Sequence, residues 1–262
     1  MKVLLSVGHS ILKTGHCTSA DGRPYGGVLE YAYNKAIVED VKKYLQSAGH
    51  TVTLSICPEL RFAKSTEEKN YKLNIEKSGN YDLVVELHLN ASALHNGRGC
   101  EVLYKSEKGK AFAQQIQKQL ATVFKNRGIQ KRDNLYMLAK TKAPAVIVES
   151  FFCDSSVDCE IAEKTDVALL IAQGIHGGAI KQRSSGFGFL YRVQLGAFRK
   201  EDNAVKLKKE LQIKGFQAFV TTVDLAGILY RVQVGAYSQK NNAEAMKKRL
   251  KDAGYDSVIV QA

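Results

Sequence analysis

Short, largely apolar segments of this sequence lead into three side chains that can bind a metal ion or transfer a proton. These side chains are His9, His88 and Glu149. A continuous apolar run bounded by polar residues is typical of a strand buried on both faces of a parallel sheet. Ligands bind just beyond the carboxyl ends of such strands, so three parallel strands would place all three side chains at one rim of the sheet.

A fourth candidate, Glu30, comes from the first turn of a predicted helix that begins near Val28. The positive end of a helix stabilises a carboxylate at this position. Two imidazoles and a carboxylate, here His9, His88 and Glu30, are the ligand set of catalytic zinc sites that keep one position for water. Glu149 would then act as the general base and later as the acid.

The remaining histidines are assigned to ordinary core or surface positions: His16, His50, His95 and His176. Two of them, His16 and His95, could compete as metal ligands. Glu86 lies two residues before His88 and therefore shares its strand face. We expect the Glu86 carboxylate to be a candidate partner for the second ring nitrogen of His88.

Strand and helix patterns alternate over the first 180 residues. Besides the strands that carry the candidate residues, strands are predicted at 51–55, 100–104 and 135–139. Helices are predicted at 28–48, 58–77, 108–126 and 166–180. This alternation predicts an α/β fold with a mixed, largely parallel sheet flanked by helices.

The C-terminal part contains an internal repeat with an offset of about 39 residues. The segment Tyr191–Phe198 returns with nearly the same sequence as Tyr230–Tyr237. Each copy has the pattern strand, amphipathic helix, strand, so two copies predict an α+β, ferredoxin-like βαββαβ domain. The polar segment 181–186 is typical of a linker. We therefore expect one domain at 1–180 and a second at 187–262.

The net charge of +12 is distributed unevenly along the chain. Residues 187–262 carry 13 basic and 7 acidic side chains, whereas residues 1–180 carry 23 and 19. The basic C-terminal part favours a polyanionic partner such as nucleic acid, an anionic cell wall or a membrane surface. No apolar run is long enough to span a bilayer. The five cysteines form no C-x-x-C pair, so we expect reduced, structural thiols, and a thiol nucleophile has no supporting pattern.

Four segments, in the same order along the chain, resemble the zinc N-acetylmuramoyl-L-alanine amidases of the amidase-3 family. They are Ser6–His9, Gly27–Glu30 with Asn34, Glu86–Ala91 and Pro144–Phe152. The resemblance covers about residues 1–180. The sequence departs from the family pattern in two places: Ser10 and Ile11 replace the usual glycines, and Glu86 stands where a small serine is usual. Both departures affect the surroundings of the ligands and not the ligands themselves.

This resemblance implies an enzyme that cleaves the amide between the lactyl group of N-acetylmuramic acid and the L-alanine of the stem peptide. It implies Zn²⁺ held by His9, Glu30 and His88, with Glu149 as the catalytic residue. Asn90, within the third motif, is a candidate substrate contact. The expected partner is peptidoglycan.

The repeat at 187–262 resembles a SPOR domain, the sporulation-related peptidoglycan-binding module. In that family the open face of the sheet binds glycan, preferentially glycan stripped of stem peptides. Strand alternation separates the side chains of each copy into two sets. The set expected to face the helices is Val193, Leu195, Val232 and Val234. The set expected to face outwards and contact glycan is Arg192, Gln194, Arg231 and Gln233.

A phage endolysin and an autolysin that frees a spore from its mother cell would both carry these features. No secretory signal is recognised, so we expect synthesis in the cytoplasm and action on the wall after holin-mediated release or lysis. The alternatives are a non-catalytic wall-binding protein and a nucleic-acid binder, because a basic βαββαβ sheet also describes an RNA-recognition domain. The aromatic-rich pattern of that domain is absent. We therefore expect no nucleic-acid partner and no membrane insertion.

Overall fold

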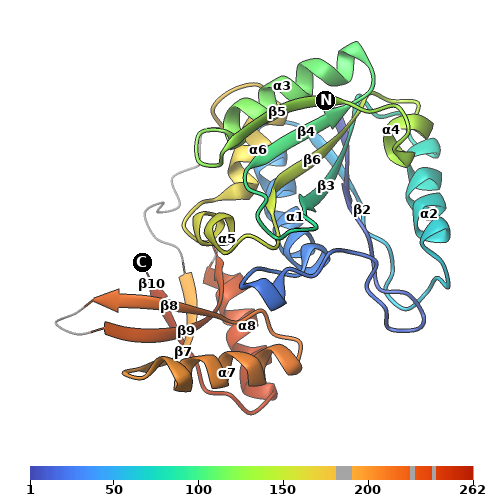
Figure 1. Ribbon diagram of the computed structural model, residues 1–262. Helices are drawn as coiled ribbons and strands as arrows, with labels where there is room; N and C mark the ends of the chain where they lie inside the picture. The colour runs from blue at the N-terminus through green and yellow to red at the C-terminus, as the bar shows by residue number, and fades with distance from the viewer. Residues whose placement is uncertain (181–190, 225–227, 238–239, 262) are drawn as a thin grey trace. The chain divides into compact units, whose positions relative to one another are not determined.

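A computed structural model of the chain describes residues 1–180, 191–224, 228–237 and 240–261. The chain divides into two compact units, Met1–Arg183 and Ser184–Ala262, and each is described by itself (Figure 1). The predicted linker 181–186 lies outside the described residues.

The first unit is built on a sheet of six strands in the order β2-β1-β3-β6-β4-β5. The strands are β1 Lys2–Val7, β2 Thr51–Ser55, β3 Leu83–Asn90, β4 Cys100–Tyr104, β5 Asn126–Lys131 and β6 Ala145–Phe152. Neighbouring strands are parallel except β4 and β6, which run antiparallel. The predicted mixed, largely parallel sheet is confirmed. Its adjacent strands β1, β3 and β6 are those that lead into or carry His9, His88 and Glu149.

Helices cover both faces of this sheet (Figure 1). They are η1 Arg23–Tyr25, α1 Glu30–Ser47, α2 Ser65–Lys77, α3 Glu107–Leu120, α4 Tyr136–Lys140, α5 Ser156–Glu163 and α6 Val167–His176. Helices α1 and α3 pack on the sheet and on α6. Helices α2 and α4 lie against the other face, where the partly buried Ile75 and the buried Met137 pack with Leu4 and Val84. Cover on both sides explains why β3 is apolar over most of its length.

The segment 135–139, predicted as a strand, forms the helix α4 instead. Met137 and Leu138 are both nearly fully buried in one cluster, whereas neighbours on a strand would point to opposite faces. The edge strand next to β4 is β5. The sequence pattern did not indicate this strand, because its side chains are mostly polar and exposed or half-buried. The helix predicted to continue to residue 126 ends at Leu120.

The second unit is an antiparallel sheet of four strands in the order β10-β7-β9-β8, with two helices. Its elements are β7 Tyr191–Phe198, α7 Glu201–Ile213, β8 Phe219–Asp224, β9 Ile228–Tyr237, α8 Lys240–Asp252 and β10 Val258–Gln261. The helices bury Ala204 and Leu211 of α7 and Ala243 and Leu250 of α8 in one core with Val193. The predicted βαββαβ domain is confirmed.

Strand alternation holds for most of the residues expected to contact glycan. Val232 and Val234 are buried in the core, as expected. The outward-facing set is partly exposed at Arg192, Gln194 and Arg231. Gln233 is different: it is only 7% exposed. It lies opposite Gln194 on one side and Phe219 on the other, and these neighbours share its face of the sheet.

Gly174 allows helix α6 to approach helix α3 closely. A Cβ atom at this position would lie 2.4 Å from Cα of Ile116, so the backbone of α3 would have to move. We expect Gly174→Ala to lower the free energy of unfolding by about 1–3 kcal/mol. The matched control is Gly178→Ala, where a Cβ atom would meet nothing within 4 Å. Urea denaturation followed by circular dichroism measures both, and equal stabilities would contradict the close approach.

Candidate active site

Three side chains converge beyond the carboxyl end of β1 and on β3. Nδ1 of His88 lies 2.9 Å, and Nε2 of His9 lies 3.4 Å, from the same oxygen, Oε1 of Glu30. One possible ligand atom from each residue lies within 4.8 Å of the other two. Among the described residues, this is the group of histidine, cysteine or acidic side chains that could hold a metal ion. The structure thus brings together the three residues selected from the sequence as metal ligands.

The Glu30 carboxylate is buried but well supplied with hydrogen bonds. It begins α1 and is 3% exposed. The backbone N–H of Ala20 donates to its Oε2 at 3.0 Å, and that of Leu89 donates to its Oε1 at 3.1 Å. Burial alone would raise the pKa of Glu30, but hydrogen bonds to His88 and His9 hold the pKa far below its usual range. A carboxylate kept ionised in this way is suited to bind a cation.

The backbone at the end of β1 leaves room for the ring of His88 and turns sharply at His9. A Cβ atom at Gly8 would lie 2.3 to 2.6 Å from ring atoms of His88, so only glycine leaves room for that ring. His9 has a φ of 62°, in the left-handed region that residues other than glycine rarely adopt. Conformations of this kind cluster at functional sites. Here the turn follows the strand directly and brings the His9 ring to Glu30.

The loop before α1 is anchored to the end of β6. The backbone N–H of Val28 donates to the carbonyl oxygen of Cys153 at 2.9 Å. A Cβ atom at Gly22 or Gly27 would come within 1.8 Å of the same oxygen, so both positions require glycine. The start of α1, and with it Glu30, is therefore fixed against the end of β6.

Glu149 of β6 lies beside His88 in the parallel ladder. Its Oε2 is buried and has no hydrogen-bond partner among the described residues. Burial raises the pKa of Glu149 to about 7, and the nearby carboxylates Glu30 and Glu101 add to this against the opposing effect of His88. A carboxyl group with such a pKa can accept a proton and return it near neutral pH.

Glu101 was not selected from the sequence, yet it lies directly opposite Glu149 in the antiparallel ladder of β4 and β6. The side-chain amide of Asn90 donates to its Oε1 at 2.5 Å, and Nε of Arg127 lies 3.7 Å from its Oε2. Asn90, the predicted substrate contact, is thus engaged with Glu101. The sequence gives no signal for this arrangement, because the antiparallel direction of β4 cannot be read from its residues.

Glu86 carries a buried ion pair behind His88. Its Oε2 lies 3.3 Å from Nε2 of His88, so the expected contact is present and the two ring nitrogens face Glu30 and Glu86. Its Oε1 pairs with the ammonium of Lys72, which also donates to the carbonyl of Val7 at 3.2 Å. Both partners of the pair are buried. Lys72 gave no sequence signal, because its helix is rich in charged side chains.

The other histidines lie outside the cluster. Nδ1 of His95 lies 2.8 Å from Asp154, and its ring stacks on Tyr25 with ring centroids 3.4 Å apart. His50 and His176, expected to be structural, face each other with ring nitrogens 3.0 Å apart. His16 lines the pocket described next without joining the ligand group.

Burial disfavours a reactive thiolate at four of the five cysteines. All five are free, and all but Cys17 are buried. Burial raises the pKa of Cys57 and of Cys100 to about 11, which disfavours the nucleophilic thiolate. Cys17, the partly exposed cysteine, lies outside the group of possible metal ligands at the sheet rim, so that group is the better candidate for chemistry.

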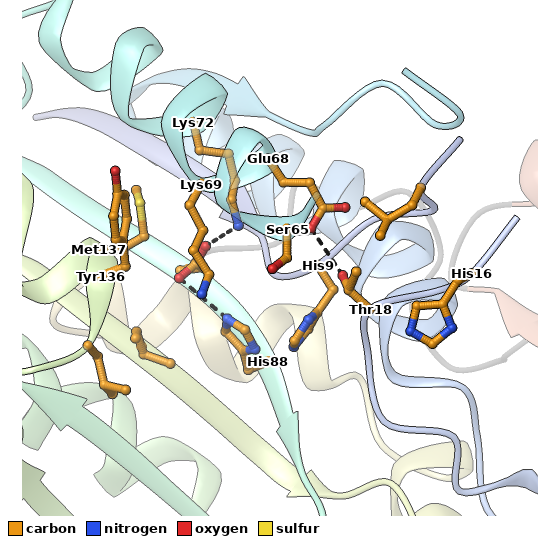
Figure 2. A pocket seen from close by; sticks show the side chains of 14 residues that line it. His9, His16, Thr18, Ser65, Glu68, Lys69, Lys72, His88, Tyr136 and Met137 are labelled. Atoms are coloured by element: carbon orange, nitrogen blue, oxygen red, sulfur yellow. Dashed lines mark hydrogen bonds and ion pairs between the residues drawn. The ribbon is translucent and has the colours of Figure 1, made fainter. Parts of the chain in front are cut away.

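A pocket of about 500 Å³ opens beside His9 and His88 (Figure 2). This volume is in the range of sites that take a small molecule or a peptide fragment. Helices α2 and α4 and the segment after β1 supply most of its walls. The other lining residues are Leu12, His16, Thr18, Ser65, Glu68, Lys69, Lys72, Glu86, Leu135, Tyr136, Met137 and Ile147.

The buried Lys72–Glu86 pair generates a stability prediction. Lys72→Met leaves the Glu86 carboxylate buried without its cation, so we expect the free energy of unfolding to fall by about 3–5 kcal/mol. The double variant Lys72→Met/Glu86→Gln removes both charges and should recover most of this loss. Urea denaturation of the full chain compares the two variants. A single variant as stable as the double variant would show that the pair is not needed to neutralise Glu86.

The chain matches two known families along its length. Residues 3–182 match Amidase_3, described as N-acetylmuramoyl-L-alanine amidase. Residues 188–261 match the SPOR domain. Among the described residues, no helix combines the length and the apolar character needed to cross a membrane.

Solved and curated proteins resemble the chain as well. The catalytic domain of the CD27L endolysin targeting Clostridia Difficile is 47% identical, with a TM-score of 0.66, and the match covers 69% of this chain and 99% of that domain. An uncharacterized 38.4 kDa protein of Clostridium perfringens is 31% identical over 71% of this chain and 54% of its own length. The sporulation-specific N-acetylmuramoyl-L-alanine amidase of Bacillus subtilis is 27% identical over 80% of this chain and 83% of its own length.

The match thus spans about half the length of the first two curated relatives, at 54% and 52%. The family resemblance expected from the four sequence segments is confirmed, because one family description covers more than half of the chain in a single stretch. That stretch contains the cluster at the sheet rim and Glu149. The chain belongs to the N-acetylmuramoyl-L-alanine amidase family, Amidase_3.

Proposed function

We propose that the chain is a zinc-dependent peptidoglycan amidase that cleaves the bond between N-acetylmuramic acid and the L-alanine of the stem peptide. The observation that carries this proposal is the convergence of His9, Glu30 and His88 at one rim of the sheet, with Glu149 beside them. Membership of the amidase family supports the same activity.

The residues present fit a zinc ion. Two imidazole nitrogens and one carboxylate oxygen are the donors of catalytic zinc sites with an open position. Two of the three donors also have outer partners: Glu86 faces the second nitrogen of His88, and two backbone N–H groups donate to Glu30. Outer partners of this kind orient ligands and raise metal affinity. We assign His9, Glu30 and His88 as the zinc ligands.

The reaction adds water across an amide bond. Zinc, when bound, would polarise the substrate carbonyl and make the attacking water more acidic. Glu149 receives the proton of this water through its unpartnered Oε2 and returns it to the nitrogen of L-alanine as the C–N bond breaks. The products are a muramic acid carboxylate and a free peptide amine. The raised pKa of Glu149, about 7, suits both halves of this transfer.

The two units divide the work in this proposal. Residues 1–180 form the catalytic domain, residues 181–186 the linker, and residues 187–262 the wall-binding domain. Arg192, Gln194 and Arg231 are the proposed glycan contacts, with Gln233 supporting them from a buried position. The match to the SPOR domain speaks against the nucleic-acid alternative, because that alternative leaves the match without a cause.

The biological setting is lysis of a bacterial cell wall, either by a phage endolysin released through a holin or by an autolysin of sporulation. An endolysin catalytic domain and a sporulation-specific amidase both resemble this chain. A holin gene beside the coding sequence would favour the endolysin.

The catalytic assignment is tested with Glu149→Gln. The amide has nearly the same shape but cannot accept the proton, so we expect turnover of a soluble muropeptide to fall about 100-fold or more while zinc content stays unchanged. His88→Ala should lose both zinc and turnover, whereas His95→Ala, outside the ligand group, should retain zinc. Amine release and metal analysis are the measurements. Full zinc content in His88→Ala would remove His88 from the ligand set.

Wall binding by the second unit is tested in the full chain carrying Glu149→Gln, so that the wall is not digested. We expect this protein to sediment with purified peptidoglycan, and Arg192→Gln/Arg231→Gln to weaken the binding by about fivefold. Lys206→Gln/Lys209→Gln removes the same charge from exposed positions on α7 and is the control. Equal weakening by both pairs would show that net charge, and not the sheet face, holds the wall.

A further inference from the structure

One wall of the pocket beside His9 and His88 is formed by polar side chains of α2. Four residues of α2 line it, at positions Ser65, Glu68, Lys69 and Lys72. Their spacing of three, four and seven residues places them on one face of the helix. A helix that only covered a sheet would present an apolar stripe here. This face of α2 therefore brings polar groups to the wall of the pocket.

The charged side chains on this face of α2 differ in whether they have a hydrogen-bond or ion-pair partner. Lys72 is neutralised by Glu86, and Glu68 accepts a hydrogen bond from Thr18 at 3.1 Å. Lys69 has neither kind of partner among the described residues. Its side chain extends from α2 into the pocket on the side of His88 (Figure 2). The pocket thus presents the ammonium of Lys69, an exposed residue without an ion-pair partner among the described residues, beside the proposed reaction centre.

Apolar side chains form another part of the wall, which also includes His16, Thr18 and Tyr136. Leu12, Leu135, Met137 and Ile147 line the pocket together with the α2 residues. Such a wall accommodates methyl and methylene groups, while the cation selects a carboxylate. Glycan chains of N-acetylated sugars are neutral next to the scissile amide and have no group for this cation.

We propose that this pocket receives the stem peptide and that Lys69 recognises the free α-carboxylate of its second residue, a γ-linked glutamate. This inference rests on the proposed amidase function and adds a substrate preference to it. The alanine methyl and the glutamate methylenes lie along the apolar wall, and the α-carboxylate, one residue beyond the scissile bond, meets the Lys69 ammonium. Peptides in which this carboxylate is an amide lose the charge-assisted hydrogen bond.

The test compares two soluble muramoyl tripeptides that differ only in this group, free α-carboxylate or α-carboxamide. We expect the zinc-loaded wild-type chain to favour the free acid by about tenfold in kcat/KM, mainly through KM, because one charge-assisted hydrogen bond is at stake. Lys69→Met should bring the ratio close to one, and Lys69→Arg should restore most of it. Lys77→Met, an exposed lysine of α2 that does not line the pocket, should keep the preference.

A second measurement does not depend on turnover. Calorimetric titration of Glu149→Gln with the released tripeptide should show tighter binding of the acid than of the amide, and adding Lys69→Met should remove this difference. Equal treatment of both substrates by the wild-type chain, or an unchanged preference in Lys69→Met, overturns the inference while leaving the amidase function intact. Cleavage of neither substrate overturns the amidase function itself, and with it the inference.

Discussion

The first unit depends on keeping one carboxylate, that of Glu30, ionised away from water. An isolated buried charge of this kind is costly, and it persists only when hydrogen bonds and opposite charges surround it. Here the surroundings come from three places in the sequence: the loop before α1, the end of β3 and the turn after β1. The same contacts that satisfy Glu30 also assemble the site. Folding and preparation for a cation are therefore one event.

The site is rich in negative charge for its size. Glu30, Glu86 and Glu101 all lie within electrostatic reach of Glu149, and the buried Lys72 forms an ion pair with Glu86. A divalent cation relieves the mutual repulsion of the others. Glu86 is the departure from the family pattern, and the structure pairs it with a second departure from ordinary burial, a lysine inside the protein. Glu86 and Lys72 form one unit, because removing either residue leaves the other one's charge buried without its opposite charge in this pair.

The sequence was sufficient for the parts of this structure that follow from periodicity and strand ends. Apolar runs identified β1, β3 and β6, and the parallel-sheet rule brought His9, His88 and Glu149 to one rim. The repeat likewise predicted the second unit. The sequence was insufficient for polar edge strands and for strand direction. Strand β5 is held by its ladder with β4 and has no buried stripe. Segment 135–139 is apolar enough to form either a strand or a helix. Glu101 and Lys72 were missed because their importance arises from neighbours that only the folded chain supplies.

The anchoring of the loop before α1 on the carbonyl of Cys153 has a mechanical consequence. Glu30 follows the loop on one side of this hydrogen bond, and Glu149 lies on β6, the strand on the other side. The separation of Glu30, the proposed ligand, from Glu149, the proposed base, is therefore constrained by a short backbone link. Separating the loop from the strand would move Glu30 away from Glu149, which is held in the sheet between β3 and β4. The proposed metal ligand and the proposed base consequently share one structural support, the junction between this loop and the end of β6.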